Sequence, residues 1–285
     1  MKAKLLDGKK VADHIATELK QRISKLTKVP ELRVIMVGDN FESKIYVQNK
    51  VRRAEELGIN IVVEQLPSSI EENSIIDLIN DFNHNWKVDG VMVQLPLPPG
   101  ISYYRVINSI NPEKDVDGFS EKNIGRLWIG QKPLIPPATP DGIMTLLDFY
   151  NLKVSGQNSV IIGRSNIVGK PLAGLLLARD STVTITHRKT RNLKEITQQA
   201  DFLFVAAGQK EFVDASYIKP KAVVVDVGMN RSDQGVTGDV DFKSVESKAS
   251  FITPVPKGIG PMTVISLMQH VVNAAKVKED GTKSK

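Results

Sequence analysis

The feature that most constrains the fold is a short apolar run that ends in a glycine turn and continues into a helix. Residues 159–162 are Ser, Val, Ile and Ile, which is typical of a buried parallel strand, and Gly163 follows directly. Residues 168–178 then carry apolar side chains at helical spacing. The first amides of such a helix point outward at the positive end of its dipole and can bind phosphate. The stretch therefore predicts a strand–turn–helix unit of an α/β domain.

The spacing of the glycines leaves the ligand of this turn open. Five residues separate Gly163 from Gly169, so the turn departs from the Gly-x-Gly-x-x-Gly pattern of dinucleotide sites. A plain glycine turn also occurs in α/β proteins that bind no cofactor there. The residues inside the turn favour a cofactor, because the Arg164 guanidinium and the Ser165 hydroxyl can both bind phosphate oxygens.

The next expected strand indicates which cofactor would bind. Residues 182–186 are followed by His187, Arg188, Lys189 and Thr190. The end of the second strand of a Rossmann unit faces the adenine ribose, where NAD-selective sites place an acid. Two cations at this point favour the 2′-phosphate of NADP, so NADP is the predicted cofactor.

Composition narrows the class of protein. The chain has 285 residues, of which 41% are hydrophobic and 25% charged, as expected for one large or two ordinary globular domains. It contains no cysteine, no apolar run of membrane length and no signal peptide, and its four histidines are scattered. We expect a cytoplasmic protein that binds no metal and no membrane.

The net charge of +6 has two interpretations. It can indicate nucleic-acid binding, or a basic surface that attracts small anions. The lysines and arginines are spread along the chain and aromatic residues make up only 6%, which favours the second interpretation. No nucleic-acid partner is expected; a basic nucleic-acid-binding module is the alternative.

Strand and helix patterns alternate along the first third of the chain. We expect strands at 32–37, 59–66 and 88–93, and helices at 5–25, 41–57 and 75–82. This alternation predicts a parallel sheet. Residues 111–140 are rich in Pro and Gly, and their second proline-rich run, at 133–140, predicts a domain boundary. The predicted fold is α/β, with a domain at 1–137, a Rossmann-type domain at 138–261, and a helix at 262–285 that packs back on the first domain.

One face of the expected helix 41–57 carries candidate chemistry. Ser43, Tyr46 and Lys50 are three and four residues apart and share that face. Such spacing is also common where a tyrosine packs and a lysine reaches solvent. Tyr-x-x-x-Lys is the catalytic pair of short-chain dehydrogenases, but there it follows the cofactor turn, whereas here it precedes the turn by more than a hundred residues.

Three other segments carry candidate ligand groups. Gln94 closes a buried strand, and ligands of α/β sheets bind beyond strand ends. Asp115 and Asp117 alternate in a Lys-Asp-Val-Asp-Gly run, where a carboxylate can bind an amino-pyrimidine edge or simply form a turn. Residues 253–263 form a rigid loop that is suited either to ligand contact or to a hinge.

Eight motifs in this order make the chain similar to the bifunctional methylenetetrahydrofolate dehydrogenase/methenyltetrahydrofolate cyclohydrolase family. The motifs are Val37-Gly-Asp-Asn40 with Ser43 and Tyr46-Val-x-x-Lys50, Asp89-Gly-Val-Met-Val-Gln-Leu-Pro-Leu-Pro98, Pro112-Glu-Lys-Asp-Val-Asp-Gly118, Asn123-Ile-Gly-Arg-Leu127, Gly163-Arg-Ser165 with Val168-Gly-Lys-Pro171, Val225-Asp-Val-Gly-Met-Asn230, Gly238-Asp-Val-Asp-Phe242, and Thr253-Pro-Val-Pro256 with Gly260-Pro-Met-Thr263. The resemblance covers nearly the whole chain.

The resemblance implies a function as well as a fold. It implies two α/β domains with a cleft between them and a homodimer. It also implies that a hydride passes from 5,10-methylenetetrahydrofolate to NADP⁺, after which water opens the methenyl product to 10-formyltetrahydrofolate. The substrate is thus a tetrahydrofolate derivative.

The resemblance also implies roles for individual residues. The catalytic residues are Lys50, Tyr46, Gln94 and Asp117, of which Asp117 grips the pterin. The substrate-binding residues are Ser43, Tyr46, Asp117, Gly260, Pro261 and Thr263. The cofactor-binding residues are Gly163, Arg164, Ser165, Val168, Gly169, His187, Arg188, Thr190, Gly208 and Met229. A charged lysine would repel the cationic methenyl substrate, so we expect a largely neutral Lys50 whose pKa is lowered by burial.

The chain departs from the family pattern at four positions. Lys257 replaces a usual glycine, Arg188 a common serine, Ala138 a common cysteine and Ser120 a common histidine. We expect Arg188 to strengthen phosphate binding and Lys257 to alter its loop or to contact an anionic glutamate tail. A different NAD(P)-linked enzyme, such as an amino-acid or malic-type dehydrogenase, is the main alternative, but it would give Gln94 and Asp117 no role.

Overall fold

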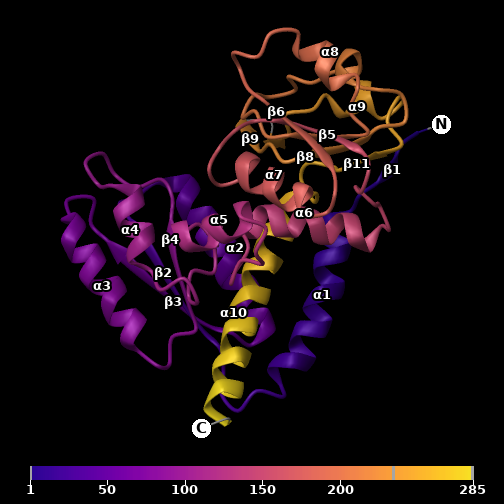
Figure 1. Ribbon diagram of the computed structural model, residues 1–285. Coiled ribbons are helices and arrows are strands. Elements are labelled where there is room, and N and C mark those ends of the chain that lie inside the picture. The colour runs from indigo at the N-terminus through magenta and orange to yellow at the C-terminus, as the bar shows by residue number, and fades with distance from the viewer. Residues whose placement is uncertain (1, 233–234, 284–285) are drawn as a thin grey trace. The chain divides into compact units, whose positions relative to one another are not determined.

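The computed structural model describes residues 2–232 and 235–283. The chain divides into two compact units, and Figure 1 labels most of their elements. The six-stranded unit comprises the segment up to Asp13 together with Thr139–Thr263. The three-stranded unit comprises His14–Ala138 and Val264–Lys285. The division falls inside two helices, α1 (Gly8–Ile23) and α10 (Ile259–Lys283).

The six-stranded unit is built on a fully parallel sheet. In spatial order its strands are β1 (Lys4–Leu5), β11 (Phe251–Ile252), β8 (Val223–Asp226), β7 (Phe202–Val205), β5 (Asn158–Ile162) and β6 (Thr182–Thr186). Ile162 pairs with Thr186 on one side and Val205 on the other. The chain thus runs outward from β5 to β6 and then returns to β7 on the opposite side. Ligands of such sheets bind beyond the strand ends at this reversal, between β5 and β7.

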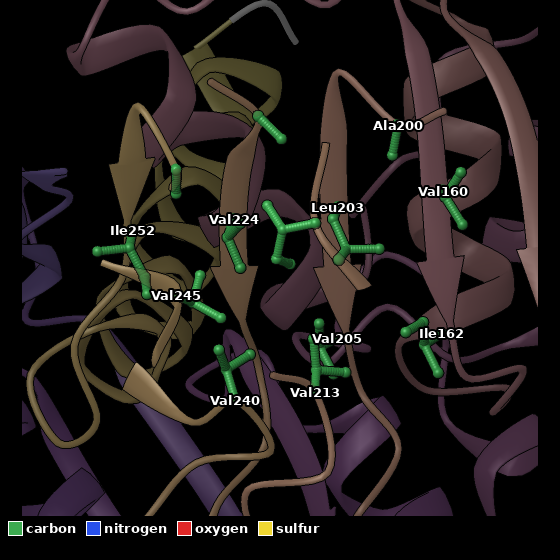
Figure 2. Packing of buried hydrophobic residues seen from close by; sticks show 13 residues of the cluster. Val160, Ile162, Ala200, Leu203, Val205, Val213, Val224, Val240, Val245 and Ile252 are labelled. Carbon is green, nitrogen blue, oxygen red and sulfur yellow. The ribbon is translucent and has the colours of Figure 1, made fainter. Parts of the chain in front are cut away.

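Both faces of this sheet are covered. Figure 2 shows one face, where Val160, Leu203, Val224 and Ile252 from neighbouring strands pack together with Val245. The elements that cover it are α8 (Leu193–Thr197), η1 (Ala215–Tyr217) and α9 (Phe242–Val245). Side chains at alternate positions of each strand point to the other face of the sheet. On that face α7 (Gly169–Leu177), whose residues are largely buried, packs on β5 and β6. A further helix, α6 (Ala138–Phe149), belongs to the same unit.

The three-stranded unit contains a smaller parallel sheet. Its order is β3 (Asn60–Leu66), β2 (Glu31–Val37) and β4 (Gly90–Gln94). The buried side chains of β2 and β4 pack with those of α3 (Glu72–His84) and α4 (Tyr103–Ser109). The remaining helices that lie wholly in this unit are α2 (Phe41–Leu57) and α5 (Glu121–Trp128). α10 contacts this sheet at Gly90, where an added Cβ would lie 3.2 Å from Val271.

The sequence explains the ends of α2, the helix with the candidate lysine. The Asn40 side chain accepts a hydrogen bond from the Ser43 amide at 2.9 Å, which caps the first turn. Gly58 ends the helix at φ +80°, a conformation that glycine adopts readily. α2 therefore follows β2 after a three-residue turn and begins at the carboxyl end of the sheet.

The predicted fold class is confirmed: both units are parallel α/β structures. The structure differs from the expectations in detail. Residues 4 and 5 form β1, which pairs with β11, so the first thirteen residues group with the six-stranded unit rather than with residues up to 137. The sequence patterns also failed to indicate α4, α5 and the hairpin of β9 (Asn230–Ser232) and β10 (Gly235–Thr237).

Two kinds of feature are absent from the described residues. None of their helices combines the length and apolarity needed to cross a membrane. Within the same ranges, no group of three or more His, Cys, Asp or Glu side chains is placed to hold a metal ion.

Candidate functional site

The three-stranded unit pairs the α2 lysine with the glutamine at the end of β4. Lys50 Nζ donates a hydrogen bond to Gln94 Oε1 at 2.9 Å. The other end of the Gln94 amide donates to the Leu95 carbonyl at 2.8 Å, which fixes the orientation of the side chain. Gln94 therefore presents its oxygen to the amine and holds it at the carboxyl end of the sheet.

Charge and burial shift the pKa values of Lys50 and Asp117 in opposite directions. Burial lowers the pKa of Lys50, against the opposing effect of the Asp117 carboxylate. Burial raises the pKa of Asp117; Lys50 and His270 act against this and Asp115 reinforces it. Both side chains are therefore closer to their neutral forms than they would be in water. This is the direction expected for a lysine that takes part in proton transfer.

The two aspartates of the Lys-Asp-Val-Asp run have different roles. Asp115 is 1% exposed, and its carboxylate accepts hydrogen bonds from the Gly118 amide at 3.0 Å and the Ser120 amide at 2.7 Å. The turn-forming interpretation thus applies to Asp115. Asp117 is only partly exposed to solvent, and the charge of its carboxylate raises the pKa of Lys50 against the effect of burial. The two residues look alike in the sequence, but Asp115 has backbone partners within its loop, whereas Asp117 interacts electrostatically with Lys50.

A buried histidine supports the same loop, although no sequence pattern singled it out. His270 of α10 is 4% exposed, and its Nδ1 lies 2.8 Å from the Val116 carbonyl. Because Val116 lies between the two aspartates, His270 fixes the backbone that presents Asp117. Only its position in an apolar helix pattern could have marked it in the sequence, and such a pattern is equally typical of a core histidine.

The other two residues of the predicted α2 face lie as expected along the helix. Ser43 is buried, and its Oγ contacts the Leu95 carbonyl at 3.4 Å. Tyr46 lies three residues further on and is partly buried. Since Ser43 and Lys50 both contact the end of β4, Tyr46 shares the face that is turned to this strand end. The structure thus gathers Ser43, Tyr46, Lys50 and Gln94 in one place.

In the six-stranded unit, the turn after β5 has room only for glycine at two positions. Gly163 has φ +131°, and a Cβ there would lie 2.3 Å from the Ala206 carbonyl oxygen. A Cβ on Gly169 would lie 2.1 Å from the Gly163 carbonyl oxygen. These contacts let the first turn of α7 approach the strand end closely, as a dinucleotide site requires.

The polar residues of this turn are oriented for anion binding. Ser165 Oγ accepts hydrogen bonds from the amides of Val168 at 3.1 Å and Gly169 at 3.4 Å. Its hydroxyl hydrogen remains for a further acceptor, such as a phosphate oxygen. Arg164 is exposed beside it. Glycines that admit no side chain, a cation and a hydroxyl donor together fit the phosphates of the predicted cofactor.

The end of β6 forms a tight turn that exposes two cations. The His187 amide donates to Thr190 Oγ1 at 2.9 Å, and the Thr190 amide donates to the His187 carbonyl at 2.7 Å. Arg188 and Lys189, inside the turn, are exposed. The turn therefore presents positive charge at the strand end that faces the adenine ribose in Rossmann units.

The remaining predicted residues lie in two loops of the six-stranded unit and in the first turns of α10. Gly208, with φ +66°, and Met229 are exposed beyond β7 and β8. A Cβ on Gly260 would lie 3.2 Å from Met229 Cε, so these two positions are neighbours. Thr263 Oγ1 lies 2.9 Å from Thr139 Oγ1. Pro261 is partly buried in the first turn of α10.

Comparisons with known proteins agree with this arrangement. Residues 6–117 match the family model described as tetrahydrofolate dehydrogenase/cyclohydrolase, catalytic domain. Residues 137–279 match the model described as tetrahydrofolate dehydrogenase/cyclohydrolase, NAD(P)-binding domain. The first range contains Lys50, Gln94 and Asp117, and the second contains the turns after β5 and β6.

Similar proteins cover almost the full length of the chain. The bifunctional protein FolD of Lactococcus lactis subsp. lactis (strain IL1403) is 50% identical over 283 residues, which is 98% of this chain and 99% of that protein. The structure of FolD methylenetetrahydrofolate dehydrogenase/cyclohydrolase from Campylobacter jejuni is 44% identical, with a TM-score of 0.95 and coverage of 96% and 99%. The Trypanosoma brucei FolD structure, complexed with NADP cofactor and inhibitor, is 32% identical, with a TM-score of 0.92 and coverage of 97% and 98%.

These matches extend over both units and all the motifs of the resemblance. A dehydrogenase with an unrelated substrate domain would match in the cofactor range alone, and a nucleic-acid-binding module would match in neither. The chain belongs to the tetrahydrofolate dehydrogenase/cyclohydrolase family.

Proposed function

We propose that this chain oxidises 5,10-methylenetetrahydrofolate with NADP⁺ and then hydrolyses the methenyl product to 10-formyltetrahydrofolate, with Lys50 serving the hydrolytic step. The observation that carries the proposal is the 2.9 Å hydrogen bond from Lys50 Nζ to Gln94 Oε1. An amine held in one orientation, with its pKa lowered by burial, suits general acid–base catalysis.

The dehydrogenase step depends mainly on positioning. NADP⁺ supplies the hydride acceptor, and the protein holds the reactants in place. In the six-stranded unit, Arg164, Ser165 and the amides at the start of α7 would bind the pyrophosphate. Arg188 and Lys189 would bind the 2′-phosphate, because their charges are exposed at the end of β6.

Asp117 is proposed to hold the pterin ring of the folate. A carboxylate can accept two parallel hydrogen bonds from an amino-pyrimidine edge. Burial raises the pKa of Asp117, and the charged form of Lys50 opposes part of that rise. Asp115 and His270 keep the loop in shape and are not proposed to touch the substrate.

In the hydrolytic step, water attacks the methenyl carbon, and the bond from that carbon to one ring nitrogen breaks as this nitrogen takes up one of the two water protons. The step consumes the positive charge of the substrate and releases one proton. Neutral Lys50 accepts this proton from the attacking water, while Gln94 holds the amine toward it. Burial favours the neutral amine before the reaction, and the Asp117 carboxylate stabilises the ammonium that forms.

A homodimer in the cytoplasm is part of the proposal, and the three-stranded sheet offers a surface for it. A bridge from Val91 to Asp115 lies beside β4, whereas β3 forms the other edge of this sheet among the described residues. An edge strand can pair with a second copy. Light scattering on the purified protein should give twice the mass of the chain.

The test follows both reactions in one cuvette. The protein is mixed with methylenetetrahydrofolate and NADP⁺, and methenyl absorbance should rise and then decay. Lys50→Met should leave the rise measurable but slow the decay by about 10²- to 10⁴-fold, the usual contribution of a general base. Lys44→Met is the matched control, because Lys44 lies on the same helix but pairs with Asp39. Full hydrolysis by Lys50→Met would contradict the proposal.

A further inference from the structure

Two buried aspartates beyond the ends of β7 and β8 have no part in the proposed reactions. Asp226 ends β8 and is 3% exposed, and Asp239 is 0% exposed. They belong to two motifs of the family resemblance, at 225–230 and 238–242, and the proposed chemistry leaves both aspartates without a role. Buried carboxylates are costly unless hydrogen bonds compensate them, so their partners indicate what they do.

The Asp239 carboxylate binds a whole loop. Its Oδ2 accepts hydrogen bonds from the amides of Ala207 at 2.6 Å and Gly208 at 2.8 Å. Its Oδ1 accepts from the Gln209 amide at 2.9 Å and from Asn230 Nδ2 at 2.8 Å. Consecutive amides that converge in this way usually form a nest for an anionic ligand. Here the anion is the carboxylate of Asp239.

Asp226 holds Asp239 in place by the same means. Its Oδ1 accepts from the amides of Gly228 at 2.9 Å and Asp239 at 3.0 Å, and its Oδ2 accepts from the Val240 amide at 2.9 Å. Burial raises the pKa of Asp226 to about 7 against these amide hydrogen bonds, and the charge of Asp239 adds to the rise. The hydrogen bonds of Asp226 and Asp239 thus connect the end of β8 to the loop beyond β7. We call this pair of hydrogen-bonded carboxylates the relay.

Two glycines make this arrangement possible. A Cβ on Gly228 would lie 2.1 Å from Asp239 Cγ, and a Cβ on Gly238 would lie 1.8 Å from Asp226 Oδ2. Each motif therefore provides one aspartate and the glycine that admits the aspartate of the other. This explains the Asp-x-Gly and Gly-Asp patterns without any contact to a ligand.

The relay determines which polar groups the loop turns outward. In a trans peptide the carbonyl points away from the amide of the next residue. Since the amides of residues 207–209 face Asp239, the carbonyls of residues 206–208 face away from it. The Ala206 carbonyl oxygen lies beside Gly163, at the reversal of strand order where a ligand is expected. Ala207 and Gly208 are exposed.

We propose that Asp239 is a positioning residue for the cofactor, and that it makes the rim formed by residues 206–208 an acceptor of hydrogen bonds. Such a rim binds donor groups, namely the ribose hydroxyls and carboxamide of the nicotinamide half, and not phosphates. Asp226 contributes by fixing the backbone of Asp239. The inference rests on the proposed function, because it takes NADP⁺ as the ligand.

The decisive variant is Asp239→Asn, which keeps the shape but replaces one acceptor oxygen by a donor. The Kd of NADP⁺ by calorimetry and the dehydrogenase KM for NADP⁺ should both rise about tenfold, as expected from weakening one or two hydrogen bonds. Hydrolysis of preformed methenyltetrahydrofolate, which uses residues of the three-stranded unit, should stay within about twofold. A merely structural role would reduce both activities together and would overturn the proposal, as would an unchanged NADP⁺ affinity.

Asp241→Asn is the matched control. Asp241 lies two residues away in the same motif, but its carboxylate accepts from the Ser244 amide at 3.2 Å and caps α9. This variant should keep its NADP⁺ affinity and nearly all of its stability, because asparagine caps helices about as well as aspartate. A rise in the Kd of NADP⁺ equal to that of Asp239→Asn would overturn the specific role of Asp239.

Amide hydrogen exchange of the wild-type protein tests the geometry without any variant. The amides of residues 207–209 should exchange slowly, although these residues lie at the surface, because Asp239 binds them. Fast exchange would overturn the proposal even if Asp239→Asn failed to fold. Failure of the proposed function would look different: the wild-type protein would not convert folate, while NADP⁺ titration and amide exchange would still report on Asp239.

Discussion

The candidate sites of the two units consist of different kinds of chemical group. In the three-stranded unit the groups that matter are side chains: the Lys50 amine, the Gln94 amide and the Asp117 carboxylate. In the six-stranded unit they are mostly backbone groups, shaped by Gly163, Gly169 and the loop that Asp239 holds. The activity of a side-chain site depends on charge and pH, whereas ligand binding at a backbone site depends on whether added atoms fit. Substitutions in the two units should therefore fail in different ways.

Among the variants that test this contrast between the two units, the largest effect is expected from one methyl group added to the backbone site. Gly169→Ala places a Cβ 2.1 Å from the Gly163 carbonyl oxygen, so α7 must move away from the strand end. We expect NADP⁺ affinity to fall about 100-fold and the protein to lose about 1–3 kcal/mol of stability. Calorimetry and thermal unfolding measure the two. Gly125→Ala is the control, because a Cβ there meets nothing within 4 Å; equal losses in both variants would contradict the contrast.

A change of charge should affect the side-chain site through pH. Gln94→Glu puts a carboxylate where Lys50 Nζ now finds an amide oxygen at 2.9 Å. The added negative charge favours the ammonium form and raises the pKa of Lys50, so the pH at which hydrolysis becomes half-maximal should move upward. A shift of one pH unit would slow the reaction about tenfold below that pH.

The pH profile of methenyl hydrolysis measures this effect. In the wild type the rate should rise with pH through a pKa below that of an ordinary lysine, because burial favours the neutral amine. Gln65→Glu adds the same charge to an exposed position on β3 and should leave the profile unchanged. A wild-type rate that fell as the pH rose would show that charged Lys50 is the active form.

Cofactor selectivity should depend on one exposed cation. Arg188→Ala should lower the preference for NADP⁺ over NAD⁺ about fivefold, because one charge-assisted contact to the 2′-phosphate is lost at a solvated site. The ratio of kcat/KM for the two cofactors measures it. Arg191→Ala, also exposed and three residues away, is the control. An unchanged ratio for Arg188→Ala would show that the cations at the end of β6 do not select NADP.

The smallest effect is expected at Lys257, which has φ +83°. Lys257→Gly should stabilise the protein by about 1 kcal/mol, because glycine adopts this conformation with less strain. Lys221→Gly, at φ +67°, should do the same and serves as the control. Denaturant unfolding measures both. If Lys257→Gly also raised the KM for a polyglutamated folate, the side chain would have the anion-binding role suggested by its charge.

The sequence was informative where chemistry and local structure coincide. The run at 159–163 could be read as a strand and a glycine turn, and Tyr46 and Lys50 could be placed on one helix face. Gln94 was identified because it follows a buried strand, and it does bind the lysine. In each of these cases the signal lies within about ten residues, where periodicity determines structure.

Features that depend on distant partners could not be predicted. β1 is only two residues long, and it is a strand because Lys4 and Leu5 pair with Phe251 and Ile252. The division of roles between Asp115 and Asp117 depends on amides at 118 and 120 and on a lysine in another element. The Asp239 relay needs a loop that lies 31 residues earlier in the chain, at Gly208. The Pro- and Gly-rich region at 111–140 also hid α5, because its turn residues obscured an eight-residue helix.

The pairing of β1 with β11 also affects how the protein is made. A ribosome releases Lys4 and Leu5 long before their partners Phe251 and Ile252. The outermost strand of this sheet therefore remains unpaired until β11 has been synthesised. In a fragment that begins at residue 138, Phe251 and Ile252 would form an unpaired edge strand, which could associate with other chains.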